Sequence, residues 1–226
     1  MPPQKSDFLA GPVALAMTLQ SGQVFHWNEN PDRSWTGLIG GHLFTLAQQG
    51  RGLAVLRGDP AIAAHHFALD HPLAEIEAAF PPEPLSQAAL AACRGMRILR
   101  QPRWECTATF ITSSMKQVAH IRGMSLAIRS RFGDPVDGSS VNAYPEIPAL
   151  ARATESALRD CGLGYRAANL LATARLLDSG QIDLEALARQ STPRLRRSLQ
   201  ALPGVGVKVA NCILLFAYER LDAVPI

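Results

Sequence analysis

Between residues 21 and 58 short apolar runs alternate with turn-forming residues, which is the pattern of strands joined by tight turns. The expected strands are "QVFHW" at 23–27, "SWTGLI" at 34–39, "GHLFTLA" at 41–47 and "LAVLRG" at 53–58. Gly40 and Gly41 separate two of these runs and predict an antiparallel hairpin, because glycine readily adopts the left-handed backbone of a two-residue turn. A small antiparallel sheet is therefore expected.

After Gly58 the spacing of apolar residues becomes helical and stays so to residue 226. "FPPEPL" at 80–85 is expected to separate two helices. Further helix ends are predicted at Pro102, Gly123, 132–140, 161–165, Gly180 and Pro203-Gly204. Two apolar stripes are expected to be buried: Leu170, Leu171, Ala174 and Leu177, and Leu195, Leu199 and Leu202. The predicted fold is α+β, with an N-terminal antiparallel β domain over 1–70 and an α-helical domain over 71–226.

The composition is that of a globular protein, with 47% hydrophobic residues in a chain of 226. No apolar run approaches the roughly 18 residues of a membrane span, and the N-terminus lacks the pattern of a signal peptide. No membrane association is expected, and the predicted location is cytoplasmic and nucleoid-associated in a bacterium or nuclear in a eukaryote. The four cysteines form no CxxC pair, so they are expected to be free thiols, and neither a metal nor a cofactor is predicted.

Charge is unevenly distributed along the chain. Residues 1–93 hold four basic and eight acidic side chains, whereas 94–131 hold eight basic and one acidic, and 189–208 hold five basic and none acidic. A concentration of cations suits a face that binds a polyanion such as DNA. A solvated arginine-rich surface is the alternative.

The segment "LPGVGVKVANC", residues 202–212, places a proline and two glycines in front of a helical run, and leucines at helical spacing precede it. The pattern predicts a helix-hairpin-helix, whose glycines let the backbone approach a ligand and whose second helix points its unpaired N–H groups at phosphate. A plain glycine-containing connection between two helices is the other interpretation.

Lys208 lies at the start of the second helix and is one of only three lysines, against 19 arginines. A helix N-terminus disfavours a positive charge, so the position suits a lysine that reacts as a neutral amine to form an imine. A phosphate contact is the alternative from chemistry alone.

Four blocks together resemble the 8-oxoguanine DNA glycosylase family, a branch of the helix-hairpin-helix DNA glycosylases. They are "LQSGQVFHW" at 19–27, "LRQPRWECTATFITSS" at 99–114, "GLGYRA" at 162–167 and "LPGVGVKVANC" at 202–212, followed by "AVPI". The matches run in the family's order from about residue 8 to the last residue. The resemblance implies excision of 8-oxoguanine from double-stranded DNA by a bifunctional glycosylase and AP lyase, expected to act as a monomer.

The resemblance also implies roles for individual residues. Lys208 takes the place of the catalytic lysine, and Gly22 and Cys212 those of the residues that contact the extruded base. Tyr165 and Arg166 match the residues that fill the gap in the duplex and contact the opposite cytosine. Gly204, Gly206 and the backbone of Val209 match the phosphate contacts.

Two departures from the family pattern follow "SS". Met115 and Lys116 stand where better-known members have two asparagines, and His120 stands where they have an arginine. Met115 can act as a wedge but cannot donate hydrogen bonds to cytosine, so Met115 and His120 predict a weaker preference for the base opposite the lesion.

The family's catalytic aspartate is expected directly after Ile226, so a form that ends there is expected to be impaired as a glycosylase. Two other functions remain open at this point. One is a non-enzymatic helix-hairpin-helix module that only binds DNA. The other is a glycosylase for another damaged base, although the "SGQVFHW" domain argues against it.

Overall fold

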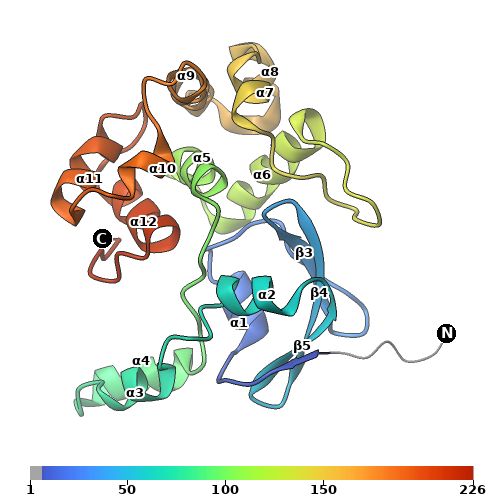
Figure 1. Ribbon diagram of the computed structural model, residues 1–226, viewed down its shortest axis with the longest axis vertical. Helices are drawn as coiled ribbons and strands as arrows, with labels where there is room; N and C mark the ends of the chain where they lie inside the picture. Colours follow the sequence, from blue (N-terminus) through green and yellow to red (C-terminus); the bar gives the residue numbers. More distant parts are fainter. Residues whose placement is uncertain (1–6, 226) are drawn as a thin grey trace. The chain divides into compact units, whose positions relative to one another are not determined.

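The computed structural model describes residues 7 to 225 and divides into two compact units, one ending at Arg100 and the other beginning at Gln101. The first unit contains a five-stranded antiparallel sheet with short helices, and the second is helical (Figure 1). The predicted α+β class, with the sheet first and the helices after it, is confirmed.

The first unit extends to residue 100 rather than to the expected domain boundary at residue 70. The reason lies in the segment that follows its last helix. The buried guanidinium of Arg97 donates to the carbonyl oxygens of Pro12 at 2.8 Å, Ala68 at 3.0 Å and His71 at 3.1 Å. The Gln23 side chain bonds the carbonyl of Arg97 and the amide of Leu99, both at 2.8 Å. These bonds tie residues 97–99 to the start of the chain.

The sheet has the strand order β1-β5-β4-β3-β2, with every neighbouring pair antiparallel. Its strands are β1 Asp7–Leu9, β2 Asn28–Glu29, β3 Trp35–Ile39, β4 His42–Gln49 and β5 Gly52–Arg57. The predicted hairpin at Gly40-Gly41 is confirmed, because Ile39 pairs with His42 and both glycines have positive φ, 55° and 81°. The sequence patterns did not predict β1.

The prediction of a strand at "QVFHW", residues 23–27, is wrong. All five residues are buried, but strand pairing begins only at Asn28. Side chains replace the ladder there: Gln23 bonds the backbone near residue 98, and His26 Nε2 lies 2.7 Å from the Leu38 carbonyl oxygen. A run of buried residues therefore resembled a strand without forming one.

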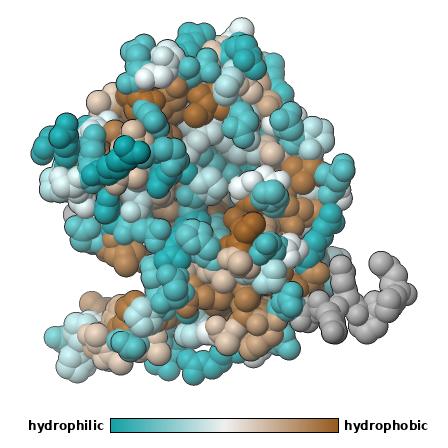
Figure 2. Space-filling model, in the orientation of Figure 1, coloured by the Kyte–Doolittle hydropathy of each residue, from teal (hydrophilic) through white to brown (hydrophobic). Residues whose placement is uncertain are grey.

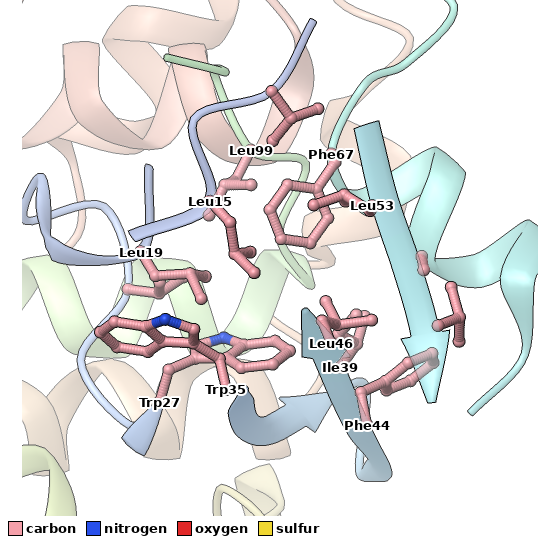
Figure 3. Close-up of a cluster of buried hydrophobic side chains, with 14 residues drawn as sticks. Leu15, Leu19, Trp27, Trp35, Ile39, Phe44, Leu46, Leu53, Phe67 and Leu99 are labelled. Atoms are coloured by element: carbon pink, nitrogen blue, oxygen red, sulfur yellow. The ribbon is translucent and has the colours of Figure 1, made fainter. Parts of the chain in front are cut away.

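Helices α1 (Leu15–Gln20) and α2 (Pro60–His66) contribute to the core against the sheet. Figure 3 shows Leu15 and Leu19 of α1 beside the rings of Trp27 and Trp35, with Phe67 after α2 near Leu53. Helices α3 (Leu73–Ala78) and α4 (Pro84–Cys93) follow, separated as predicted by the prolines at 80–85. They bury little apolar surface, and Figure 2 shows apolar residues on the exterior of this segment, where Ile76, Phe80 and Leu85 are exposed.

His66 makes the first unit sensitive to acid. Its ring is 3% exposed, stacks with Trp27 at 6.4 Å between centroids, and places Nδ1 2.6 Å from the Arg100 carbonyl oxygen. Burial lowers the pKa of His66 to about 4, so the folded protein holds it neutral. The unfolded chain gains this proton near pH 6.5 and the folded protein only near pH 4, so stability is lost as the pH falls through that window.

We expect the free energy of unfolding to drop by about 3 kcal/mol from this group between pH 7.5 and pH 4, at 1.36 kcal/mol per unit of pKa difference. Urea unfolding at both pH values measures the drop. In the H66F variant the pH-dependent loss should shrink by most of that amount. The control H42Q, at an exposed histidine, should keep the wild-type dependence, and an H66F protein as acid-sensitive as the wild type would refute the assignment.

The second unit contains eight α-helices among the described residues, with a π-helical turn, η1, at Arg159–Leu163. The α-helices are α5 Arg103–Ser113, α6 Val118–Phe132, α7 Ile147–Ala151, α8 Glu155–Leu158, α9 Arg166–Asp178, α10 Leu184–Leu187, α11 Thr192–Gln200 and α12 Val207–Tyr218. The stripes at 170–177 and 195–202 are buried as predicted. The predicted helix end at Gly123 is wrong: α6 passes through it and ends before Gly133, whose N–H bonds the Arg129 carbonyl at 2.9 Å.

Candidate active site

Helices α11 and α12 form the predicted hairpin. Their facing sides are apolar and buried, with Leu195 and Leu199 on α11 and Ala210, Ile213 and Leu214 on α12. A polar contact also joins them, because Arg196 Nε donates to Asn211 Oδ1 at 2.9 Å. The Asn211 side chain donates in turn to the Val224 carbonyl at 2.8 Å, which fixes the segment after α12.

The two glycines of the hairpin turn have different structural reasons. Gly204 has φ of 79°, and a Cβ there would lie 2.9 Å from the Asn169 side chain, so both backbone and packing require glycine. Gly206 is the N-cap of α12 with ordinary φ of −83°. A Cβ at Gly206 would meet no heavy atom of residues 7–225 within 4 Å. The bare backbone at Gly206 therefore leaves room for a ligand to approach the helix end.

The first turn of α12 presents backbone N–H groups at that end. The Ala210 N–H donates to the Gly206 carbonyl at 2.9 Å, so the helical hydrogen bonds begin there. By the geometry of an α-helix, the amides of residues 207–209 precede the first intrahelical acceptor. Such amides, with the positive end of the helix dipole, favour an anionic group. The phosphate contacts predicted at Gly204, Gly206 and Val209 fit this arrangement.

Lys208 and Cys212 lie one helical turn apart at the start of α12. Lys208 is exposed, whereas Cys212 is 8% exposed. Burial raises the pKa of the Cys212 thiol to about 11, although the nearby Lys208 charge acts in the opposite direction. Cys212 is therefore a neutral thiol at neutral pH. It offers an apolar surface beside an accessible amine.

The predicted opposite-base residues lie around the end of α5 and the start of α9. Met115 is 91% exposed and Tyr165 is 57% exposed, whereas Arg166 is buried. Arg166 connects the two segments, because its guanidinium bonds the carbonyl of Ser114 and lies 4.4 Å from the centroid of the Tyr165 ring. His120 is exposed in the first turn of α6, the helix that follows Met115.

Gly22 belongs to the first unit and follows α1. Its φ of 86° lies in the left-handed region, which favours glycine. The next residue, Gln23, is buried and held by two bonds to the backbone of residues 97 and 99, so the loop that carries Gly22 is anchored. The fixed backbone is a precondition for recognition through a carbonyl group.

Sequence reasoning missed three supporting side chains: Asn169 against Gly204, Asn211 between the hairpin and the segment after it, and the bond from Arg166 to Ser114. Each acts across 13 or more residues of sequence, where no local pattern signals a partner.

The cysteines are free thiols as predicted, with Cys93 exposed and the other three buried. Within residues 7–225 no group of three histidine, cysteine, aspartate or glutamate side chains could hold a metal ion. Nor does any helix of that region have the length and apolar character needed to cross a membrane.

Comparisons with known proteins agree with this geometry. The sequence profile described as 8-oxoguanine DNA glycosylase, N-terminal domain, matches residues 7–107. An Arabidopsis thaliana protein named N-glycosylase/DNA lyase OGG1 is 31% identical, over 95% of this chain and 63% of its own length. The N-glycosylase/DNA lyase of Saccharomyces cerevisiae is 28% identical, over 95% of this chain and 65% of its own length. The chain thus spans less than two thirds of either curated relative.

A solved structure entitled "Structure of MBOgg1 in complex with low affinity DNA ligand" superposes with a TM-score of 0.91 at 27% identity, covering 98% of this chain and 82% of the other. A sheet unit followed by a helical unit with a glycine-rich hairpin defines the class, that of the helix-hairpin-helix proteins. Within it, the chain belongs to the 8-oxoguanine DNA glycosylase family.

Proposed function

We propose that this protein is a base-excision repair enzyme that removes 8-oxoguanine from double-stranded DNA and then nicks the strand as an AP lyase. The observation that carries the proposal is the position of Lys208, an exposed amine in the first turn of α12 directly after the Gly204–Gly206 turn. The names of the relatives in Arabidopsis thaliana and Saccharomyces cerevisiae, N-glycosylase/DNA lyase, support the same chemistry.

In the proposed reaction the neutral Lys208 amine attacks C1′ of the damaged nucleotide. The bond from C1′ to the base breaks, and the base leaves with the electron pair and takes up a proton. Opening of the sugar ring and loss of the amine's protons give an imine between Lys208 and C1′. The imine acidifies the C2′ hydrogen, and loss of that proton expels the phosphate from C3′, which cuts the strand.

Base recognition is assigned to Gly22 and Cys212. The carbonyl oxygen of Gly22 would accept the N7 hydrogen that 8-oxoguanine carries and guanine lacks. Guanine would instead set two acceptors against each other away from water, which costs free energy. The neutral Cys212 thiol would pack against one face of the extruded base.

Grip on the duplex is assigned to the turn and the basic segments. The amides near Gly204, Gly206 and Val209 would bind a phosphate, and the excess of basic residues in 94–131 and 189–208 would add sequence-independent affinity. Such contacts offset the few kcal/mol, roughly, that base extrusion costs. We propose that the protein acts as a monomer, in the cytosol or nucleoid of a bacterium or the nucleus of a eukaryote.

The direct test compares a duplex that contains 8-oxoguanine opposite cytosine with the same duplex containing guanine. Release of 8-oxoguanine and a nicked strand from the first duplex alone support the proposal. Equal binding to both duplexes without any product would indicate a DNA-binding module. Products only from duplexes that carry oxidised pyrimidines or mispaired adenine would indicate a different glycosylase.

The opposite-base preference should be weak. Met115 and His120 lack the amide and guanidinium donors that would read cytosine, and an apolar contact distinguishes partners by only about a hundredfold, against 10⁴ or more, roughly, for a hydrogen-bonded site. Single-turnover rates on 8-oxoguanine opposite each of the four bases should therefore lie within about a hundredfold. The M115N variant should increase the preference for cytosine. A wild-type preference of several thousandfold would contradict the prediction.

A further inference from the structure

Arg166 is a buried cation at the start of α9. It is 4% exposed. Its Nε donates to the Ser114 carbonyl oxygen at 2.8 Å, one terminal nitrogen donates to the same oxygen, and the other lies 3.4 Å from the Leu163 carbonyl. Two N–H groups on one carbonyl, from residues 52 positions apart, form a strong charge-assisted contact. The guanidinium is therefore committed to the backbone and presents little surface to a ligand.

The carbonyl that Arg166 holds immediately precedes Met115. Met115 has φ of 57°, in the left-handed region that a methionine rarely adopts and that costs on the order of 1 kcal/mol or more. The Lys116 N–H donates to the Ser113 carbonyl at 3.2 Å and closes the turn. The result is an apolar side chain, 91% exposed, held outward by a strained turn at the end of α5. Strain of this kind persists only where the surroundings fix it.

Arg166 also supports Tyr165. The guanidinium carbon lies 4.4 Å from the centroid of the tyrosine ring, within the range of a cation–π contact, and the ring is 57% exposed. One buried cation thus links the two exposed side chains, Met115 and Tyr165, across two helices. Flat and apolar side chains held outward in this manner suit insertion between base steps of a duplex.

We infer that Arg166 is a positioning residue: it acts through the Ser114 carbonyl and the Tyr165 ring to hold Met115 and Tyr165 ready to enter the duplex, and it does not read the opposite base. The inference rests on the proposed function for its DNA-dependent part. It assigns Arg166 a role different from the cytosine contact that the family resemblance implied. The difference follows from its burial and its committed donors.

The kinetic test uses R166Q, R166K, M115A and the double variant R166Q/M115A, with R159Q as the control because Arg159 is an exposed arginine paired with Glu155. R166Q should slow release of 8-oxoguanine by about tenfold opposite all four bases alike, because a misplaced insertion residue costs rate without regard to the partner base. R166K, which keeps the charge and one donor, should recover part of the rate. In the M115A background, R166Q should add less than it does alone, since coupled residues are not additive.

A second measurement needs no catalysis. Hydrogen exchange of the free protein should show faster exchange of the Lys116 amide in R166Q than in the wild type, with R159Q unchanged. If the wild type releases no 8-oxoguanine, the proposed function fails while the exchange result still tests the contact. Two outcomes overturn the inference: unchanged exchange at Lys116 in R166Q and R166K, or a loss of rate confined to duplexes with cytosine opposite the lesion.

Discussion

The K208Q variant is expected to lose base release, strand nicking and borohydride trapping on duplexes with 8-oxoguanine, with rates lower by roughly a thousandfold or more. Glutamine keeps the length and polarity of the side chain but has no amine to form the bond to C1′. Lys208 is exposed, so the substitution removes no buried contact and the fold should be preserved. Duplex affinity should change only severalfold, roughly, because the turn amides remain in place.

The matched control is K116Q, which removes the other lysine of the second unit, also exposed. Wild type and K116Q should both give a trapped complex, and peptide mapping of the complex should locate the adduct on Lys208. The small number of lysines makes the mapping unambiguous, since the chain has three. A covalent complex that persists in K208Q, or that is lost in K116Q alone, would mean that another amine performs the reaction.

Local sequence patterns were sufficient for elements that satisfy their hydrogen bonds internally. The Gly40-Gly41 hairpin and the helices flanking residues 201–206 depend on turn chemistry and apolar spacing, both of which can be read within a few residues. The "QVFHW" segment failed the same test. Its hydrogen bonds go to side chains and to residues near 98, so its burial could be predicted but its conformation could not.

The candidate site divides in the same way. The hairpin and the adjacent Lys208 could be located from residues 202–212 alone, because the helix N-terminus and the glycines lie together in sequence. The environment of Arg166 could not, since its main partner, Ser114, is 52 residues away. An arginine beside a tyrosine in "GLGYRA" gives no sign that it is 4% exposed. Roles that depend on distant backbone acceptors therefore required the structure.

The largest expected effect on stability in the second unit is that of E105A, about 3–5 kcal/mol in the free energy of unfolding. Glu105 on α5 pairs with Arg129 on α6, and the Arg129 side chain is 1% exposed. Arg129 also donates to the Asn142 carbonyl at 3.1 Å and lies 5.3 Å from the centroid of the Tyr144 ring. Alanine at position 105 would remove the carboxylate and leave a buried cation without its counter-ion, which is the costly state.

Urea unfolding of four variants separates this cost from a general effect of losing a glutamate. E155Q, at the exposed pair Glu155–Arg159, should change stability by less than about 1 kcal/mol. E105L/R129M, which removes both charges, should recover most of the loss seen in E105A, because no ion remains to be desolvated. E105A and R129M alone should each be less stable than the double variant. If the double variant is no more stable than E105A, packing around Tyr144 and Asn142 outweighs the charge, and the helices α5 and α6 are joined by the shape of Arg129 rather than by its ion pair.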